Sequence, residues 1–226
     1  MTLFAYHWNF APVLGFLPVL ITGLLVTLVL TAAAILIGTP LGLVTGVLLL
    51  MPTKLLRLPL QWATDAVRAL PPLVLLLWVY YFVPFVIGVP DLAAFWLATI
   101  AFSINLAAFV ADVVRASITA FPRNLVDAAV ACGLTPAKTL QKIVLPDVVR
   151  ELLPALTVLY IGVLKMTSLA SIVTVHEVVH AADAIRIETF QVIEVYTVLG
   201  ILYLLVVMPL SAAARRLETS TWFKRR

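Results

Sequence analysis

Apolar residues dominate five long stretches of the chain, and shorter segments with polar and charged residues separate them. A transmembrane helix needs about 20 apolar residues to cross the hydrocarbon core with every backbone amide paired internally. All five stretches meet this requirement. We therefore expect an all-α integral membrane protein that forms a single domain over residues 1–226. Its five transmembrane helices are predicted near residues 14–50, 60–83, 92–116, 150–173 and 192–213.

The first stretch, 14–50, is long enough for two crossings, because Gly38-Thr39-Pro40 would allow either a reversal or a kink in one tilted helix. Lys and Arg are enriched in inner loops. One long helix with an outer amino terminus places all of the 15 basic residues on the inner side except Lys165 and Arg186. Splitting the stretch would move the amino terminus inside without any basic residue to hold it there. We therefore predict five crossings, with an outer amino terminus and an inner carboxyl terminus. The inner basic residues are then Lys54, Arg57, Arg68, Arg115, Arg123, Lys138, Lys142, Arg150, Arg215, Arg216, Lys224, Arg225 and Arg226.

Composition agrees with a membrane protein, since 63% of the residues are hydrophobic and the mean hydropathy is +1.13. The net charge of +4 lies in the inner loops and tail, where orientation and anionic membrane lipid account for it without nucleic acid. The single cysteine, Cys132, excludes an internal disulfide. The chain carries no Gly-rich phosphate loop, so any ATP that drives this protein must bind another subunit.

A polar segment over residues 127–146, DAAVACGLTPAKTLQKIVLP, interrupts the apolar pattern. It predicts two short helices. Gly133 is suited to the left-handed conformation that ends the first, Thr135 is a good N-cap for the second, and Pro136 fits its first turn. The residue before Pro146 is expected to leave helical geometry, so that the chain turns back toward the membrane.

The same segment resembles the cytoplasmic EAA loop of permease subunits in bacterial ATP-driven (ABC) importers. An acidic residue and two alanines are followed by three residues, a glycine, nine residues and Ile-x-Leu-Pro, with aspartate in place of the usual glutamate. The resemblance implies that a loop over about residues 117–149 carries a coupling helix between the third and fourth transmembrane helices, docked on a separate ATPase. The docking residues implied are Asp127, Ala128, Ala129, Gly133, Ile143, Leu145 and Pro146.

Further motifs are similar to those of permeases for polar amino acids, of the histidine and glutamine importer type. These motifs are GLLVT at 23–27, RALPPLV at 68–74, AFVADVVR at 108–115 and KMTSL at 165–169. The resembling family has Gly-Thr at Ala69 and Leu70, Tyr at Phe109 and Asp at Met166. These departures widen the expected cargo to polar amino acids or related small zwitterions.

The family resemblance also implies the setting of the chain. It would be a non-catalytic subunit in the bacterial inner membrane, paired with a second copy or a related subunit. Two ATPase subunits would lie at the cytoplasmic face, and an extracytoplasmic solute-binding protein would deliver the cargo. ATP and magnesium would bind to the ATPase, and this chain would carry no cofactor of its own. Access would alternate from outside to inside. An ATP-independent channel or carrier subunit is an alternative that ATP-dependent uptake would distinguish.

Polar residues inside the predicted helices are candidates for a substrate pathway, because a charge such as Lys165 is costly in lipid unless it faces a partner or a wet cavity. Asn105 and Asp112 fall on nearly the same helical face. The alternative is structural: Asp112 would pair with Arg115, Lys165 would bond to carbonyls at a helix break, and the hydroxyls would join helices. The pathway candidates are Lys165, Thr167, Ser168, Ser171, Asn105, Asp112 and Arg68.

A competing motif, His-Glu-x-x-His, occurs at residues 176–180. In zinc proteases two such histidines bind the metal and the glutamate is the general base. The alternative function is therefore an intramembrane zinc metalloprotease, with Asp183 or Glu188 as a third ligand. The resembling permeases commonly have a glutamate followed by an apolar residue at this place, so Glu177 and Val178 also fit an importer without a metal site.

Overall fold

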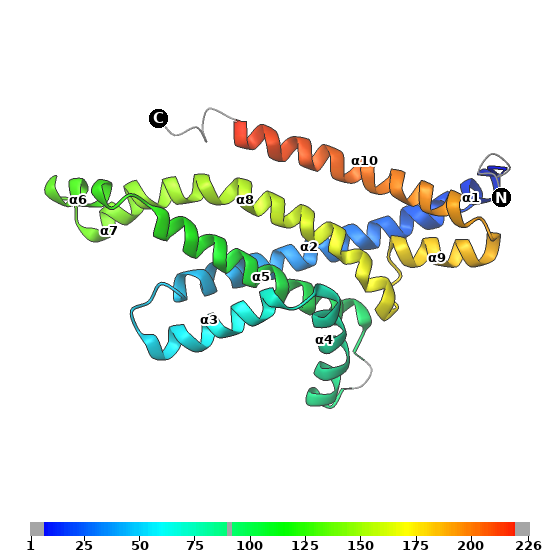
Figure 1. The fold of residues 1–226 in the computed structure, drawn as a ribbon, viewed down its shortest axis with the longest axis horizontal. Helices are drawn as coiled ribbons and strands as arrows, with labels where there is room; N and C mark the ends of the chain where they lie inside the picture. The colour runs from blue at the N-terminus through cyan, green and yellow to red at the C-terminus, as the bar shows by residue number, and fades with distance from the viewer. Residues whose placement is uncertain (1–6, 90–91, 220–226) are drawn as a thin grey trace.

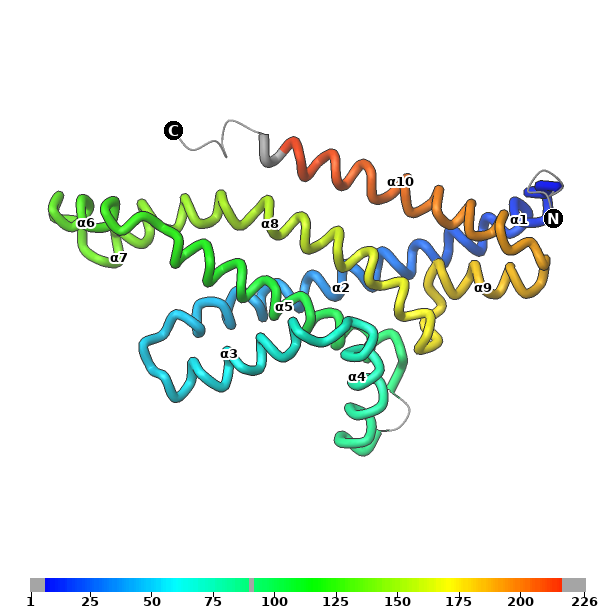
Figure 2. Tube along the Cα trace, in the orientation of Figure 1, coloured from blue at the N-terminus to red at the C-terminus, as the bar shows by residue number. Residues whose placement is uncertain are grey.

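A computed structural model of the chain describes residues 7–89 and 92–219, and within these ranges it contains helices and no strands (Figures 1 and 2). The predicted inner residues Lys224, Arg225 and Arg226 lie outside the described residues. The elements in chain order are α1 (Ala11–Gly15), α2 (Leu17–Leu48), α3 (Lys54–Ala69), α4 (Pro72–Ile87), α5 (Ala94–Ala120), α6 (Arg123–Ala131), α7 (Pro136–Thr139), the π-helical segment η2 (Leu140–Val144), α8 (Leu145–Met166), the 3-10 segment η3 (Thr167–Val173), α9 (Val178–Thr189) and α10 (Val192–Thr219).

The five predicted membrane crossings correspond to four long helical spans and one bent pair of helices. By length and composition, α2, residues 136–173, α5 and residues 192–216 are each sufficient to cross a membrane, and the bent pair of α3 and α4 gives a fifth span when it is counted as one. Helix α2 is one continuous helix of 32 residues that passes through Pro40, so the first stretch does not reverse. Helix α10 begins beside α1 and runs toward the end of the molecule that carries α6 and α7 (Figure 1).

The predicted helix over 60–83 is corrected by the structure, which contains α3 and α4 bent by 112° at a short break. Leu70 and Pro71 have extended backbone there, with ψ of 136° and 135°. Two successive prolines, Pro71 and Pro72, supply no amide hydrogens, and a proline disfavours helical geometry in the residue before it. Figure 1 shows that α4 consequently turns away from the direction of α3.

Helices α2 and α5 form the most extensive helix contact in the described chain. Three glycines spaced one turn apart on α2, Gly38, Gly42 and Gly46, face α5. A Cβ atom added to Gly42 would lie 2.6 Å from the Cβ atom of Val110. Small residues at such spacing let two helix backbones approach closely in a membrane, where dispersion contacts drive helix association. Helix α5 is thereby buried at the centre of the bundle.

The polar segment forms the two predicted short helices, α6 and α7. Gly133 follows α6 with φ of 78°, which is the predicted left-handed conformation. The hydroxyl of Thr135 accepts a hydrogen bond from the amide of Lys138 at 3.4 Å and so caps α7.

The predicted break before Pro146 is wrong. Leu145 is helical, with φ of −61° and ψ of −44°, and α7 continues through η2 into α8. In η2 the turn widens, and the amide of Leu145 donates to the carbonyl oxygen of Leu140, five residues back. Pro146 is then the second residue of α8, which directly follows the wide turn of η2.

Candidate functional site

Helices α6 and α7 and segment η2 project at the end of the molecule opposite α1 (Figure 1). We call residues 123–146 the coupling segment. Within it, Asp127, Ala128, Gly133, Leu145 and Pro146 are exposed. The other two predicted docking residues face inward: Ala129 is buried, and Ile143 is half-buried against the hydrophobic core. The list from the sequence therefore divides into a surface that a partner could contact and residues that hold this surface to the bundle.

Large apolar side chains on the coupling segment are also exposed, and the sequence prediction missed most of them. Leu125, Val130 and Leu140 expose 46%, 54% and 56% of their area, similar to Leu145 at 50%. Leu125 and Val130 lie on α6, outside the spans that are long and apolar enough to cross a membrane, whereas Leu140 and Leu145 lie at the start of the span 136–173. Their presence in an otherwise polar segment was the available signal, and it indicates a surface for another protein.

A cluster of charged side chains joins the break between α3 and α4 to α5. Arg68 Nη2 lies 2.9 Å from Asp112 Oδ2, and Arg115 Nη2 lies 2.9 Å from Asp112 Oδ1. The Asp112–Arg115 pair is the one predicted from the spacing in α5. The guanidinium of Arg68 also lies 5.7 Å from the ring centroid of Phe109, within the range of a cation–π contact. The pair between Arg68 and Asp112 joins separate helices and was not predicted.

Lys165 lies in the last turn of α8, directly before η3, and its side chain is exposed on the single chain. The nearby hydroxyls bond to carbonyls of their own segment. Thr167 donates to the carbonyl of Leu164 at 2.7 Å, Ser168 to that of Lys165 at 2.8 Å, and Ser171 to that of Ser168 at 2.9 Å. These bonds stabilise a 3-10 segment and do not join helices.

The pathway candidates on α5 are not joined to those of α8 and η3 by any hydrogen bond or ion pair that the described residues make. Asn105 is buried in α5, and its Nδ2 atom has no hydrogen-bond partner among the described residues. Asp112 instead binds Arg68 and Arg115. Within one chain, therefore, the seven candidates do not form a single site.

Glu177 is fully buried and caps the amino terminus of α9. The amides of Val179 and His180 donate to Glu177 Oε1 at 2.9 and 3.0 Å, and the hydroxyl of Thr27 donates to Oε2 at 3.2 Å. Glu177 lies between the helical spans 136–173 and 192–216. Burial raises its pKa to about 7, although the hydrogen bonds from the two amides and from Thr27 act in the opposite direction.

The geometry at residues 176–180 does not fit a zinc protease. The rings of His176 and His180 lie edge to face with centroids 4.6 Å apart. However, α9 begins at Val178, so the two histidines do not lie on one helix. The Glu177 carboxylate, which would be the general base of a protease, instead caps α9 and accepts a hydrogen bond from Thr27. Among the described residues no third His, Cys, Asp or Glu joins the two histidines as a potential ligand.

Comparison with known proteins identifies the family. The family described as "Binding-protein-dependent transport system inner membrane component" matches residues 38–222. The octopine transport system permease protein OccM of Rhizobium radiobacter is 30% identical over 92% of this chain and 87% of its own. The L-cystine transport system permease protein TcyB of Bacillus subtilis (strain 168) is 31% identical over 90% and 87% of the two chains. A crystal structure of an amino acid ABC transporter with histidines is 28% identical, with a TM-score of 0.88 over 94% of this chain and 99% of that one. The chain therefore belongs to the family of binding-protein-dependent transport system inner membrane components, the permeases of ABC transporters.

Proposed function

We propose that this permease is the membrane subunit of an importer that carries polar amino acids or related small zwitterions, driven by ATP hydrolysis in separate subunits. The observation that carries the proposal is the exposed coupling segment, with its apolar side chains at the end opposite α1. The named relatives support the cargo class, because they transport octopine and cystine. Cargo would move by alternating access, as a population shift between two packed states.

The coupling segment is proposed to dock an ATPase subunit that holds ATP and magnesium, while this chain contributes no catalytic group. Exposed Asp127, Ala128 and Gly133 would enter a cleft of the ATPase, with Leu145 and Pro146 beside it. Buried Ala129 and half-buried Ile143 would transmit the movement to the bundle. The continuous helical path from α7 through η2 into α8 makes this connection stiff.

The coupling segment would lie in the cytoplasm and α1 on the outer side of the bacterial inner membrane. The positive-inside distribution supports this orientation. An extracytoplasmic solute-binding protein would then approach the end that carries α1 and α9. A second permease copy or a related subunit would cover part of the apolar bundle, since one such small bundle does not enclose a transport path.

Lys165 is proposed to face the transport path formed with the second subunit, because its exposed ammonium group would be costly against lipid. Asn105, Thr167, Ser168 and Ser171 remain proposed lining residues. Arg68 and Asp112 are proposed to act at this path only through their mutual ion pair, which fixes the break between α3 and α4 against α5.

Replacement of Gly133 by leucine tests the coupling proposal. A Cβ atom there meets nothing within 4 Å, so a side chain would project outward, and φ of 78° would strain it. We expect Gly133→Leu to insert normally but to lose co-purification of the ATPase subunit and ATP-dependent uptake in proteoliposomes. Gly88→Leu is the matched control, because Gly88 has φ of 71°, equal free space and a position outside the coupling segment. Undiminished co-purification of Gly133→Leu, or uptake without ATP, would contradict the proposal.

A further inference from the structure

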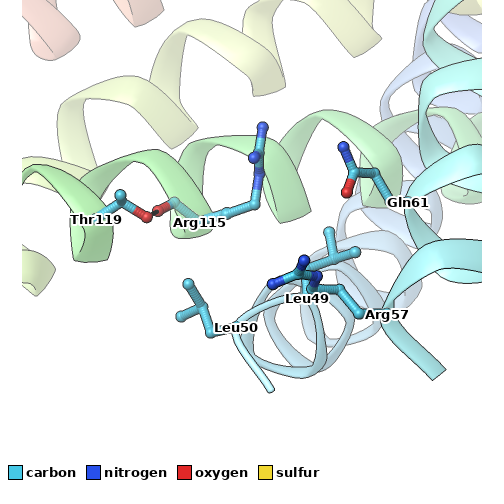
Figure 3. Close-up of a pocket in the computed structure, with 6 residues that line it drawn as sticks. All are labelled: Leu49, Leu50, Arg57, Gln61, Arg115 and Thr119. Atoms are coloured by element: carbon cyan, nitrogen blue, oxygen red, sulfur yellow. Dashed lines mark hydrogen bonds between the residues drawn. The ribbon is translucent and has the colours of Figure 1, made fainter. Parts of the chain in front are cut away.

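A pocket of about 290 Å³ opens between the end of α2, the first half of α3 and the last turns of α5 (Figure 3). We call it the inner-end pocket, since it lies toward the end that carries the coupling segment (Figure 1). It is separate from the coupling segment and from the pathway candidates of α8 and η3. Its lining residues are Leu49, Leu50, Arg57, Gln61, Arg115 and Thr119.

The polar lining of the inner-end pocket comes from two facing helices. Arg57 and Gln61 lie one turn apart on α3, and Arg115 and Thr119 lie one turn apart on α5. The hydroxyl of Thr119 donates to the carbonyl of Arg115 at 2.6 Å. The available donors are therefore two guanidinium groups and one amide, and the lining includes no carboxylate.

The side chain of Arg57 makes no hydrogen bond with the part of the chain that the structure describes. Its Nε atom is buried without a hydrogen-bond partner there, and it forms no ion pair with a described residue. Arg115, in contrast, donates a hydrogen bond from Nη2 to the Asp112 carboxylate. A buried donor without an acceptor costs about 1–3 kcal/mol. An anion in the pocket would satisfy Arg57 and share the remaining donors of Arg115.

The place of Arg57 in its helix also favours an anion. Arg57 and Lys54 occupy the first turn of α3, and that turn contains no acidic residue. Cations at a helix amino terminus are unfavourable because the aligned backbone dipoles already make that end positive. The positive charges of Lys54 and Arg57 therefore do not stabilise α3. A bound anion would offset the positive charge of both side chains and of the amino-terminal end of the helix.

The surroundings of the pocket identify the source of the anion. Leu55 and Trp62 on α3 expose 88% and 76% of their area, although the pocket side of the same helix is polar. Such an amphipathic helix is typical of the boundary between hydrocarbon and headgroups, and tryptophan prefers that depth. Acyl chains would cover Leu55 and Trp62 on one face of α3, while a headgroup phosphate would reach the arginines from the opposite, pocket-lining face.

We propose that the inner-end pocket binds the headgroup phosphate of an anionic phospholipid from the inner leaflet, held by Arg57, Arg115 and Gln61. The planar guanidinium group suits a phosphate because it offers paired donors in one fork. Basic pockets between helices on the cytoplasmic side are a known mode of lipid recognition. Its lining residues lie outside the coupling segment, and the choice of the inner leaflet rests on the orientation proposed above.

Lipid binding to the purified full-length chain in mild detergent tests the site. A short-chain phosphatidylglycerol is titrated, with phosphatidylcholine of equal chain length as the zwitterionic comparison, and native mass spectrometry measures the bound fraction. We expect Arg57→Gln to weaken phosphatidylglycerol binding about tenfold, the cost of a charge-assisted hydrogen bond. Arg57→Lys keeps the positive charge but not the paired donors of the guanidinium group. Its affinity for phosphatidylglycerol should therefore lie between those of the unmodified protein and Arg57→Gln. Lys138→Gln is the control, since it removes the same charge from an exposed position on α7 and should change the affinity less than about twofold.

Three results would overturn the proposal. The first is unchanged binding in Arg57→Gln, and the second is an equal loss in Lys138→Gln, which would indicate attraction by net charge alone. The third is displacement of phosphatidylglycerol by equimolar inorganic phosphate, which would assign the pocket to a soluble anion. Partial binding by Arg57→Lys shows that substitution at this position leaves the protein folded.

Discussion

The hydroxyl of Thr27 in α2 donates a hydrogen bond to Glu177 Oε2 at 3.2 Å, although the two residues are 150 positions apart in the chain. The same hydroxyl oxygen accepts the amide of Val178 at 3.2 Å. Both side chains are completely buried. Thr27 therefore joins α2 to the start of α9, and Glu177 both caps α9 and anchors it to the bundle.

Replacement of Thr27 by valine tests this connection. Thr27→Val keeps the shape of the side chain but leaves the Glu177 carboxylate and the Val178 amide each with one partner fewer in a buried site. Loss of partners for buried polar groups costs about 1–3 kcal/mol, so we expect a lower Tm in detergent. Thr27→Ser retains the hydroxyl and is the control. Equal Tm values for Thr27→Val and the unmodified protein would show that the hydrogen bonds contribute no net stability.

The raised pKa of Glu177 predicts a pH dependence of stability. Burial raises the pKa from 4.5 to about 7, so the folded state holds this proton more tightly than the unfolded chain. The stability that comes from this difference is complete below 4.5 and is lost as pH rises through about 7. We therefore expect Tm to decrease across this interval, and Glu177→Gln to remove part of the decrease. The histidines are present in both proteins, so the difference between the two pH profiles isolates Glu177. Parallel profiles would refute the assignment.

The close contact between α2 and α5 predicts that Gly42 does not tolerate a side chain. A Cβ atom there would lie 2.7 Å from the carbonyl oxygen of Ala107 as well as 2.6 Å from the Cβ atom of Val110. The backbone of α5 would have to move, and overpacking of this kind costs about 1–3 kcal/mol. We expect Gly42→Ala to lower Tm. Gly162→Ala is the control, because a Cβ atom on Gly162 meets nothing within 4 Å. A similar Tm in both variants would mean that the helices separate at little cost.

The features that the sequence predicted correctly depend on local chemistry. Long apolar stretches predicted α2 and α5, Gly133 and Thr135 predicted the ends of α6 and α7, and a spacing of three predicted the pair between Asp112 and Arg115. In each case the residues involved are close in sequence, so propensity and spacing are sufficient.

The prediction failed where the outcome depends on tertiary contacts or on a neighbouring turn. Pro71 ends a helix, whereas Pro146 lies inside one because the wide turn of η2 precedes it. The bonds from Arg68 to Asp112 and from Thr27 to Glu177 join separate helices. Nothing in the spacing of either pair reveals that they meet.

Replacement of Lys165 by methionine tests the proposed transport path. Methionine is similar in length and removes the charge, so a structural role in lipid would predict equal or higher stability. If the ammonium group contacts the cargo, we expect Lys165→Met to raise the KM for uptake in proteoliposomes about tenfold or more, since a charge-assisted hydrogen bond is lost. Thr157→Ala is the control, because Thr157 is not a pathway candidate and its hydroxyl donates to the carbonyl of Leu153 within α8. Uptake by Lys165→Met at normal affinity would remove Lys165 from the path, and the ATPase rate measured in the same vesicles separates a defect in cargo binding from a defect in coupling.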